Sequence, residues 1–273
     1  MDKPYKGKTA TIGVFDSGVG GLTVLAELVR MLPNFSYLYF ADAAFCPYGS
    51  KSNEQILQRA RIATDFLLAK GCQLVVVACN TATAAAISSL RNSYSIPFVG
   101  MEPAIKPAAQ TTKTKIIGVL ATAGTFNGKL YQETVQRYAQ GVEIIYRVGD
   151  GLVELVEKAK HKSPAARELL MKYIEPMISA NADHIVLGCT HYPFFIHILN
   201  EIVPPNISIV DPAPAVALQT QRIVDGMSLP PSTSSSAPSI QLFSSAPHNH
   251  LETLSEVIAG THRKSFYKFL PLA

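Results

Sequence analysis

No apolar run in this sequence is long enough to cross a bilayer, and its first residues do not form a signal peptide. The longest apolar runs, such as Gln73–Cys79, have about the length of one buried strand. Residues 1–15 carry several charged side chains and pass directly into a strand-like run, without the apolar core and cleavage site of a signal peptide. We therefore expect a cytoplasmic protein with no membrane-spanning segment.

Basic segments are also missing. The net charge is +4, but Lys and Arg are scattered along the chain and do not interleave with aromatic residues. A nucleic-acid-binding surface would need such clustering. The composition, with 48% hydrophobic residues in a chain of 273, instead predicts a globular protein of one large domain or two modest ones.

Disulfide and zinc motifs are absent as well. The four cysteines are Cys46, Cys72, Cys79 and Cys189, and no pair of them has C-x-x-C spacing. The histidine closest in sequence to any of them is His191. In a reducing compartment these residues stay free thiols. We predict neither a disulfide framework nor a metal site.

What the sequence does contain is an alternation of apolar, β-branched runs with segments of helical period. The expected strands are Thr11–Phe15, Tyr37–Phe40, Leu74–Ala78, Phe98–Val99, Ile116–Ala121, Val142–Tyr146, His184–Leu187, Ile207–Val210 and Ile240–Ser244. The expected helices are Leu22–Leu32, Asn53–Ala69, Ala82–Arg91, Thr125–Ala139, Ala165–Ala180 and Val216–Asp225. This pattern predicts an α/β fold with mainly parallel sheets covered on both faces. The Ser- and Pro-rich stretch 228–239 is expected to be a loop that separates the last strand and a short C-terminal helix from the rest.

The chain also contains two copies of one pattern. Residues 12–18 (IGVFDSG) match 117–123 (IGVLATA), and 76–81 (VVACNT) match 186–191 (VLGCTH), at offsets of 105 and 110 residues. The repeat predicts two pseudo-symmetric α/β domains. Residues 1–98 and 209–273 would form the first domain, and 99–208 would be inserted as the second. Because ligands bind at the carboxyl ends of parallel strands, we expect the active site in a cleft between the domains.

Two cysteines, Cys79 and Cys189, occupy equivalent places in this repeat. Each follows a predicted strand and a small residue, and each precedes two polar residues. A helix N-terminus beside a thiol favours the thiolate. Two thiols on opposite sides of a substrate suit the inversion of a carbon, which needs a base on one face and an acid on the other. Cys46 and Cys72 lack this context and are expected to be structural.

Other polar residues fall at predicted strand ends. The loop Asp16–Gly21 lacks the third glycine of a G-x-G-x-x-G motif, and its backbone donors suit a carboxylate better than a phosphate. Asp16 could be an N-cap or a charged partner of a thiol, and His191 could cap its own helix. Pro47-Tyr48-Gly49 could be a simple turn. The candidate hydroxyl donors for substrate carboxylates are Thr81, Thr122, Thr125 and Thr190.

Four ordered motifs closely resemble the glutamate racemases of bacterial cell-wall synthesis, in the aspartate/glutamate racemase family. They are FDSGVGGL at 15–22, PYG at 47–49, ACNTAT at 78–83 and GCTHYP at 188–193. The resemblance covers nearly the whole chain and implies a buried glutamate between two α/β domains. It also implies that L- and D-glutamate interconvert without a cofactor, supplying D-glutamate for peptidoglycan. A pyridoxal enzyme would need a Schiff-base lysine, and none of the four motifs contains one.

The resemblance also implies roles for individual residues. Cys79 and Cys189 would be the proton-transfer pair, and Glu157, in Leu155-Val-Glu157, would support the surroundings of the second thiol. The residues implied or expected to bind substrate are Asp16, Ser17, Pro47, Tyr48, Gly49, Asn80, Thr81, Thr122, Thr125, Thr190 and His191, and of these Asp16 and His191 would also assist catalysis. The chain departs from the family pattern at Ala43, Gly128 and Gly149-Asp150.

Three alternatives stay open. An aspartate or other amino-acid racemase of the same superfamily would carry a second motif resembling Gly-Cys-Thr-Glu, so His191 favours glutamate. A non-catalytic amino-acid-binding protein would also have two lobes around a cleft, but two matched cysteines serve no evident purpose there. A cysteine-dependent hydrolase would use one thiol with a base and no symmetric mate. A homodimer is compatible with the sequence, whereas we expect no nucleic-acid or membrane partner.

Overall fold

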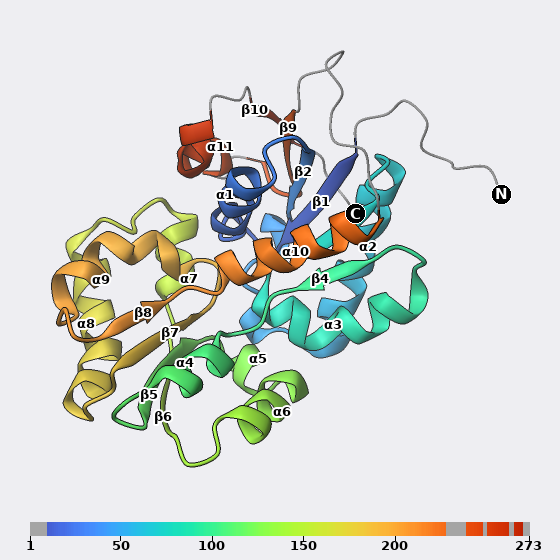
Figure 1. Ribbon diagram of the computed structural model, residues 1–273. Coiled ribbons are helices and arrows are strands. Elements are labelled where there is room, and N and C mark those ends of the chain that lie inside the picture. Colours follow the sequence, from blue (N-terminus) through green and yellow to red (C-terminus); the bar gives the residue numbers. More distant parts are fainter. Residues whose placement is uncertain (1–9, 228–238, 248–249, 262–264, 270–273) are drawn as a thin grey trace.

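The computed structural model of the chain describes residues 10–227, 239–247, 250–261 and 265–269 (Figure 1). Two parallel sheets, each with helices packed against it, confirm the predicted α/β class. We call the first sheet with its helices the first lobe, and the second sheet with its helices the second lobe. The loop predicted at 228–239 lies outside the described residues except for Ser239.

The first lobe is built on six parallel strands in the order β10-β9-β2-β1-β3-β4. The strands are β1 (Thr11–Asp16), β2 (Ser36–Ala41), β3 (Leu74–Val77), β4 (Phe98–Gly100), β9 (Ile240–Ser244) and β10 (Ser265–Phe269). The helices are α1 (Leu22–Met31), α2 (Asn53–Ala69), α3 (Asn80–Ser93), α10 (Ala213–Met227) and α11 (Leu251–Leu254). Along β1, Val14 packs into one core cluster and Phe15 into another, because the sheet is covered on both faces.

The second lobe is built on four parallel strands in the order β6-β5-β7-β8. The strands are β5 (Ile116–Ala121), β6 (Glu143–Val148), β7 (His184–Gly188) and β8 (Ser208–Val210). The helices are α4 (Ile105–Thr111), α5 (Ala123–Phe126), α6 (Lys129–Tyr138), α7 (Leu152–Glu157), α8 (Pro164–Ser179) and α9 (Ile196–Ile202). This strand order repeats the order β2-β1-β3-β4 of the first lobe, so the two copies found in the sequence adopt the same topology.

The helix predicted over Thr125–Ala139 was wrong as one element. The structure divides that stretch into α5 and α6, since Gly128 is extended, with φ −70° and ψ 133°. Thr122 instead caps α5, accepting a hydrogen bond from the backbone of Thr125. Elements that the sequence analysis missed are α4, α7, α9 and the edge strand β10.

The edges of the two sheets lie close to the predicted domain boundaries. β4, which ends at Gly100, pairs with β3 in the first sheet, and β8, which ends at Val210, pairs with β7 in the second. Each strand therefore runs two residues past the predicted limits, which are residue 98 for the first part of the first domain and residue 208 for the second domain. The division of the chain into domains at those residues stays a prediction.

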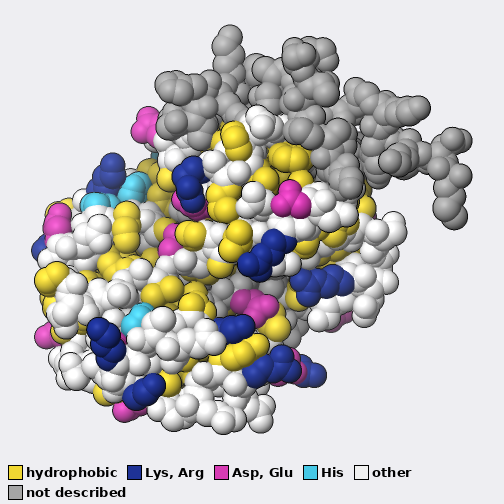
Figure 2. All heavy atoms as spheres, viewed as in Figure 1, with side chains coloured by type: hydrophobic (Ala, Val, Ile, Leu, Met, Phe, Trp, Pro, Cys, Tyr) yellow, Lys and Arg dark blue, Asp and Glu magenta, His cyan; other side chains and the backbone are white. Residues whose placement is uncertain are grey.

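Two further features concern the predicted lack of a basic patch and of a membrane-spanning segment. On the face shown in Figure 2, Lys and Arg side chains lie scattered among acidic and apolar ones. None of the helices in the described ranges has the length and apolar character needed to span a bilayer.

Candidate active site

Both cysteines of the repeat follow the third strand of their topological unit. Cys79 lies two residues after the end of β3, and Cys189 directly follows β7. Asp16 ends β1, and Thr122 directly follows its counterpart β5. Because parallel strands end at one edge of a sheet, each lobe gathers its functional side chains along that edge.

The two strand-end edges meet at a cavity of about 10 Å³, roughly the space of a single water molecule. It is lined by Ser17, Pro47, Tyr48, Gly49, Cys79, Asn80, Thr81, Thr122, Val153, Cys189, Thr190 and His191. All of these except Val153 were candidate site residues. The candidates Asp16, Thr125 and Glu157 lie outside this lining and contact its members.

Cys79 lies at the N-terminus of α3. Its Sγ accepts a hydrogen bond from the backbone of Ala82 at 3.4 Å and lies 3.7 Å from Oγ of Ser17. Burial raises the pKa of the Cys79 thiol, and the nearby carboxylate of Asp16 raises it further, whereas the Ala82 N–H lowers it. The site in this form therefore favours the neutral thiol at Cys79.

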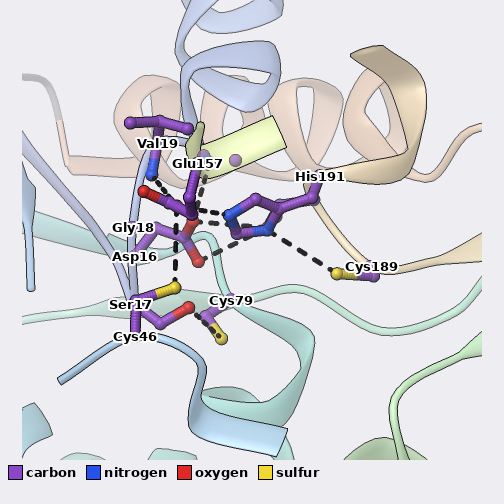
Figure 3. Close-up of polar contacts among 12 residues, drawn as sticks. Asp16, Ser17, Gly18, Val19, Cys46, Cys79, Glu157, Cys189 and His191 are labelled. Carbon is purple, nitrogen blue, oxygen red and sulfur yellow. Dashed lines mark hydrogen bonds and ion pairs between the residues drawn. The ribbon is translucent and has the colours of Figure 1, made fainter. Parts of the chain in front are cut away.

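Cys189 contacts a buried histidine, which in turn contacts a partly buried carboxylate (Figure 3). Its Sγ lies 3.7 Å from Nδ1 of His191, whose Nε2 donates to Oε1 of Glu157 at 2.6 Å. Burial alone would lower the pKa of His191, but contacts with Cys189, Cys46 and Glu157 outweigh it and raise the pKa well above its ordinary value. Burial raises the pKa of Glu157, but contacts with His191, the backbone of Val19 and Cys46 together outweigh it and lower the pKa. His191 and Glu157 thus form a charged pair beside the second thiol.

Asp16 connects the two lobes close to this charged pair. Its Oδ2 accepts from the backbone of Gly21 at 2.8 Å, and the hydroxyl of Thr190 donates to the same carboxylate at 3.3 Å. Burial raises the pKa of Asp16, against the charge of His191, which lowers it. The N-cap of α1 is Gly21, so the expectation that Asp16 caps a helix was wrong, whereas the expectation of a charged group near Cys79 is met.

The glycine-rich loop directs its backbone donors to carboxylates of the protein itself. Val19 N donates to Oε1 of Glu157 at 2.7 Å, as Gly21 N does to Asp16. A Cβ on Gly20 would lie 2.5 Å from Oγ1 of Thr190, so only glycine permits the second lobe to approach this closely. The expectation that these donors suit a substrate carboxylate is corrected for both of them.

Hydroxyl and amide groups form another part of the cavity wall. Thr81 Oγ1 lies 2.8 Å from Thr122 Oγ1 and 3.4 Å from Thr125 Oγ1, so three hydroxyls from both lobes converge. Asn80 is buried, and neither polar atom of its side chain has a hydrogen-bond partner. An unsatisfied buried amide costs about 1–3 kcal/mol, so a polar ligand at this wall would be stabilised. His191 precedes a 3₁₀ helix, and its side chain does not cap it.

Tyr48 is held in the cavity wall by a buried ion pair that the sequence analysis missed. Its hydroxyl donates to Oδ2 of Asp42 at 2.5 Å, and Arg59 from α2 donates to both oxygens of Asp42, at 2.8 and 2.9 Å. The guanidinium also stacks on the ring of Phe45, 3.8 Å from its centre. The loop that carries Pro47-Tyr48-Gly49 is therefore more than a simple turn.

Comparison with known proteins assigns the chain to a class. Residues 12–220 match the family model described as Asp/Glu/Hydantoin racemase, which is more than half of the chain. The chain belongs to this racemase family. A protein named glutamate racemase from Ectopseudomonas mendocina is 49% identical over 216 residues, which are 79% of this chain and 82% of that protein.

Solved structures show the same relationship. The Escherichia coli glutamate racemase, in complex with L-glutamate and the activator UDP-MurNAc-ala, superposes with a TM-score of 0.84 at 32% identity, covering 97% of this chain and 100% of that one. A glutamate racemase isoform from Bacillus anthracis gives 0.82 at 28% identity, covering 97% and 99%. The pseudo-symmetric two-sheet fold is therefore that of the glutamate racemases.

Proposed function

We propose that this protein is a glutamate racemase that interconverts L- and D-glutamate without a cofactor and supplies D-glutamate for peptidoglycan synthesis. The observation that carries the proposal is that Cys79 and Cys189, from equivalent places in two lobes, line one cavity. The names of the similar proteins support glutamate as the substrate. The isolated thiol of a cysteine hydrolase would not need this symmetry.

In the proposed reaction one thiolate removes the α-proton and the opposite thiol delivers a proton to the other face. Cys189 would act on L-glutamate and Cys79 on D-glutamate. The imidazole ring of His191, 3.7 Å from Cys189, is placed to interact with this sulfur as it gains or loses the proton. Cys79, whose pKa burial raises, would then start as the proton donor.

The carbanion formed between the two steps needs hydrogen-bond donors at the substrate's carboxylates. The converging hydroxyls of Thr81, Thr122 and Thr125 and the unpaired amide of Asn80 are suitable donors. Further polar contacts would come from Ser17, Tyr48, Gly49 and Thr190 in the wall. A cavity with so little room for water would also limit side reactions of the carbanion.

Incubation of the protein in deuterated water with single enantiomers of glutamate or aspartate, and no added cofactor, tests the proposal. Optical rotation should decay from either glutamate enantiomer, and the inverted product should carry deuterium at the α-carbon. Early in the reaction the remaining substrate should keep its proton, since two separate groups handle the two faces. Strict dependence on pyridoxal phosphate, or rapid turnover of aspartate beside inertness toward glutamate, would contradict the proposal.

A further inference from the structure

Cys46 is a thiol at the candidate active site that the two-thiol reaction does not use. It lies between a 3₁₀ helix, Ala43–Phe45, and Pro47, and is partly buried. Its Sγ is 3.6 Å from Oε1 of Glu157, the same oxygen that accepts from His191. Figure 3 shows the thiol and the imidazole ring approaching this carboxylate from two directions. Burial raises the pKa of the Cys46 thiol to about 12.

These three side chains have the donor atoms of a transition-metal site. Their sulfur, oxygen and nitrogen ligand atoms all lie within 4.8 Å of one another. In the described ranges, no other three His, Cys, Asp or Glu side chains bring ligand atoms this close. Sulfur and imidazole nitrogen are ligands of zinc-type cations, whereas magnesium and calcium prefer all-oxygen sites. The donor set therefore selects for a borderline or soft divalent ion.

The separations between these ligand atoms can be compared with those around a tetrahedral zinc ion. Tetrahedral ligands at zinc distances of about 2.0–2.3 Å lie roughly 3.3–3.7 Å apart. The separation of 3.6 Å between Cys46 Sγ and Glu157 Oε1 falls in this range. The 2.6 Å separation between His191 and Glu157 must widen, because an ion would replace the proton that now lies between them.

Gly18 packs closely against this carboxylate, and a larger residue would not fit there. A Cβ at residue 18 would overlap the Glu157 carboxylate and would lie 3.0 Å from the Cys46 sulfur. Cys46 and Glu157 are partly buried, and His191 is buried. We infer that Cys46, Glu157 and His191 bind a zinc-type divalent cation with three protein ligands and one open position.

Occupation of this site has a consequence for the active site. Cys46 belongs to the first lobe, and Glu157 and His191 belong to the second, so the ion would join the two. Binding releases the thiol proton of Cys46 and the Nε2 proton of His191 to solvent, with no change of oxidation state. The ring then loses its positive charge beside Cys189. We therefore expect the bound ion to inhibit racemisation. That inhibition rests on the proposed function, but binding of the ion does not.

Cobalt(II) is a spectroscopic probe for such a site, and the serine variant Cys79→Ser/Cys189→Ser removes the two thiols that line the cavity. Only Cys46 and Cys72 then remain as thiols. We expect a thiolate-to-cobalt charge-transfer band that Zn²⁺ abolishes by displacement. Adding Cys46→Ser should remove the band, and adding Cys72→Ser, which changes a buried thiol in the core of the first lobe, should not. Circular dichroism checks that each variant is folded.

A band that survives Cys46→Ser, or the absence of a band at millimolar cobalt in the folded parent variant, would overturn the inference. Glu157→Gln provides a second variant and should weaken cobalt binding at least about tenfold, since a carboxylate ligand is lost. In the enzyme with both cavity cysteines intact, Zn²⁺ should inhibit racemisation, and Cys46→Ser should raise the inhibitory concentration about tenfold or more. Because the absorption measurement uses no substrate, its failure is distinguishable from a failure of the proposed racemisation.

Discussion

His191 and Glu157 join through Nε2 and Oε1 at 2.6 Å, and this contact orients the other ring nitrogen toward Cys189. The carboxylate is itself fixed by the backbone of Val19 at 2.7 Å, across the two lobes. A fixed carboxylate behind an imidazole raises the pKa of the ring and sets its orientation. The charge beside the second thiol therefore depends on a residue that does not line the cavity.

Replacing Glu157 by glutamine should lower the pKa of His191, which the contact with Glu157 helps to raise. The positive ring is lost as pH rises through its raised pKa, so the alkaline loss of activity should begin at lower pH in the variant. We expect kcat/KM for L-glutamate to fall at least about tenfold near neutral pH, or ~1.4 kcal/mol. The control is Glu154→Gln, an exposed position on the same helix. Matching pH–rate profiles in the two variants would contradict this role.

Replacing either cavity cysteine by serine should nearly abolish racemisation, since a hydroxyl is too weakly acidic to supply the base. Elimination from a threo-β-chloroglutamate needs only one base, so each variant should keep elimination toward one enantiomer. Cys189→Ser should retain it for the D-enantiomer and Cys79→Ser for the L-enantiomer. Chloride release measures the elimination by each variant with each enantiomer. If Cys189→Ser left racemisation largely intact, or if both variants preferred the same enantiomer, the two-thiol mechanism would be wrong.

Arg59→Lys should disturb substrate binding through Tyr48, because lysine cannot reproduce the two-pronged contact with Asp42. We expect KM for glutamate to rise about tenfold, in line with the 1.5–3 kcal/mol of a hydrogen bond to a charged group. In a Tyr48→Phe background the same change should have a much smaller effect. Arg61→Lys, at an exposed position on the same helix, is the control. Equal effects of Arg59→Lys in both backgrounds would show that Tyr48 is not involved.

Asp183 offers a test of stability away from the site. Its carboxylate accepts from the hydroxyl of Thr112 at 2.7 Å and the backbone of Lys113 at 2.6 Å, and it pairs with His184 at 2.7 Å. Although burial acts in the opposite direction, these contacts lower the pKa of Asp183. A depressed carboxylate pKa gives stability that is present above the unfolded pKa of about 3.9 and is lost as pH falls through the folded value.

Asp183→Asn should therefore unfold at lower urea concentration at pH 7, and its deficit relative to the unmodified protein should shrink as pH falls below about 4. Urea titrations at several pH values measure this. Asp225→Asn, at an exposed position on α10, should show no such pattern. A deficit that is constant from pH 7 to pH 3 would mean that the charge of Asp183 is not responsible.

The sequence predicted the parts of the molecule that depend on local pattern or on the repeat. The paired contexts of Cys79 and Cys189 placed both thiols at strand ends, where the structure has them. The break between α5 and α6 was missed because the apolar period continues through Gly128. A helical pattern of apolar residues does not reveal that a single glycine within it has an extended backbone.

Contacts between distant segments could not be predicted in the same way. The Arg59–Asp42 pair joins a helix to a loop, and nothing in the spacing of the two residues marks them as partners. Cys46 was expected to be structural, because its position beside Glu157 depends on how the two lobes meet. Val153 lines the cavity but has the sequence character of any apolar helix residue. Each of these depends on tertiary arrangement more than on residue type.

The small cavity between the two thiols limits how a substrate can enter the site. A chamber with room for about one water molecule cannot admit an amino acid while the lobes stay as they are. The cavity must therefore widen before an amino acid can enter, and the contact between the Thr81 and Thr122 hydroxyls is one that a separation of the two lobes would break. If this widening limits the rate, turnover would depend on the viscosity of the solvent as well as on the acidity of the two thiols.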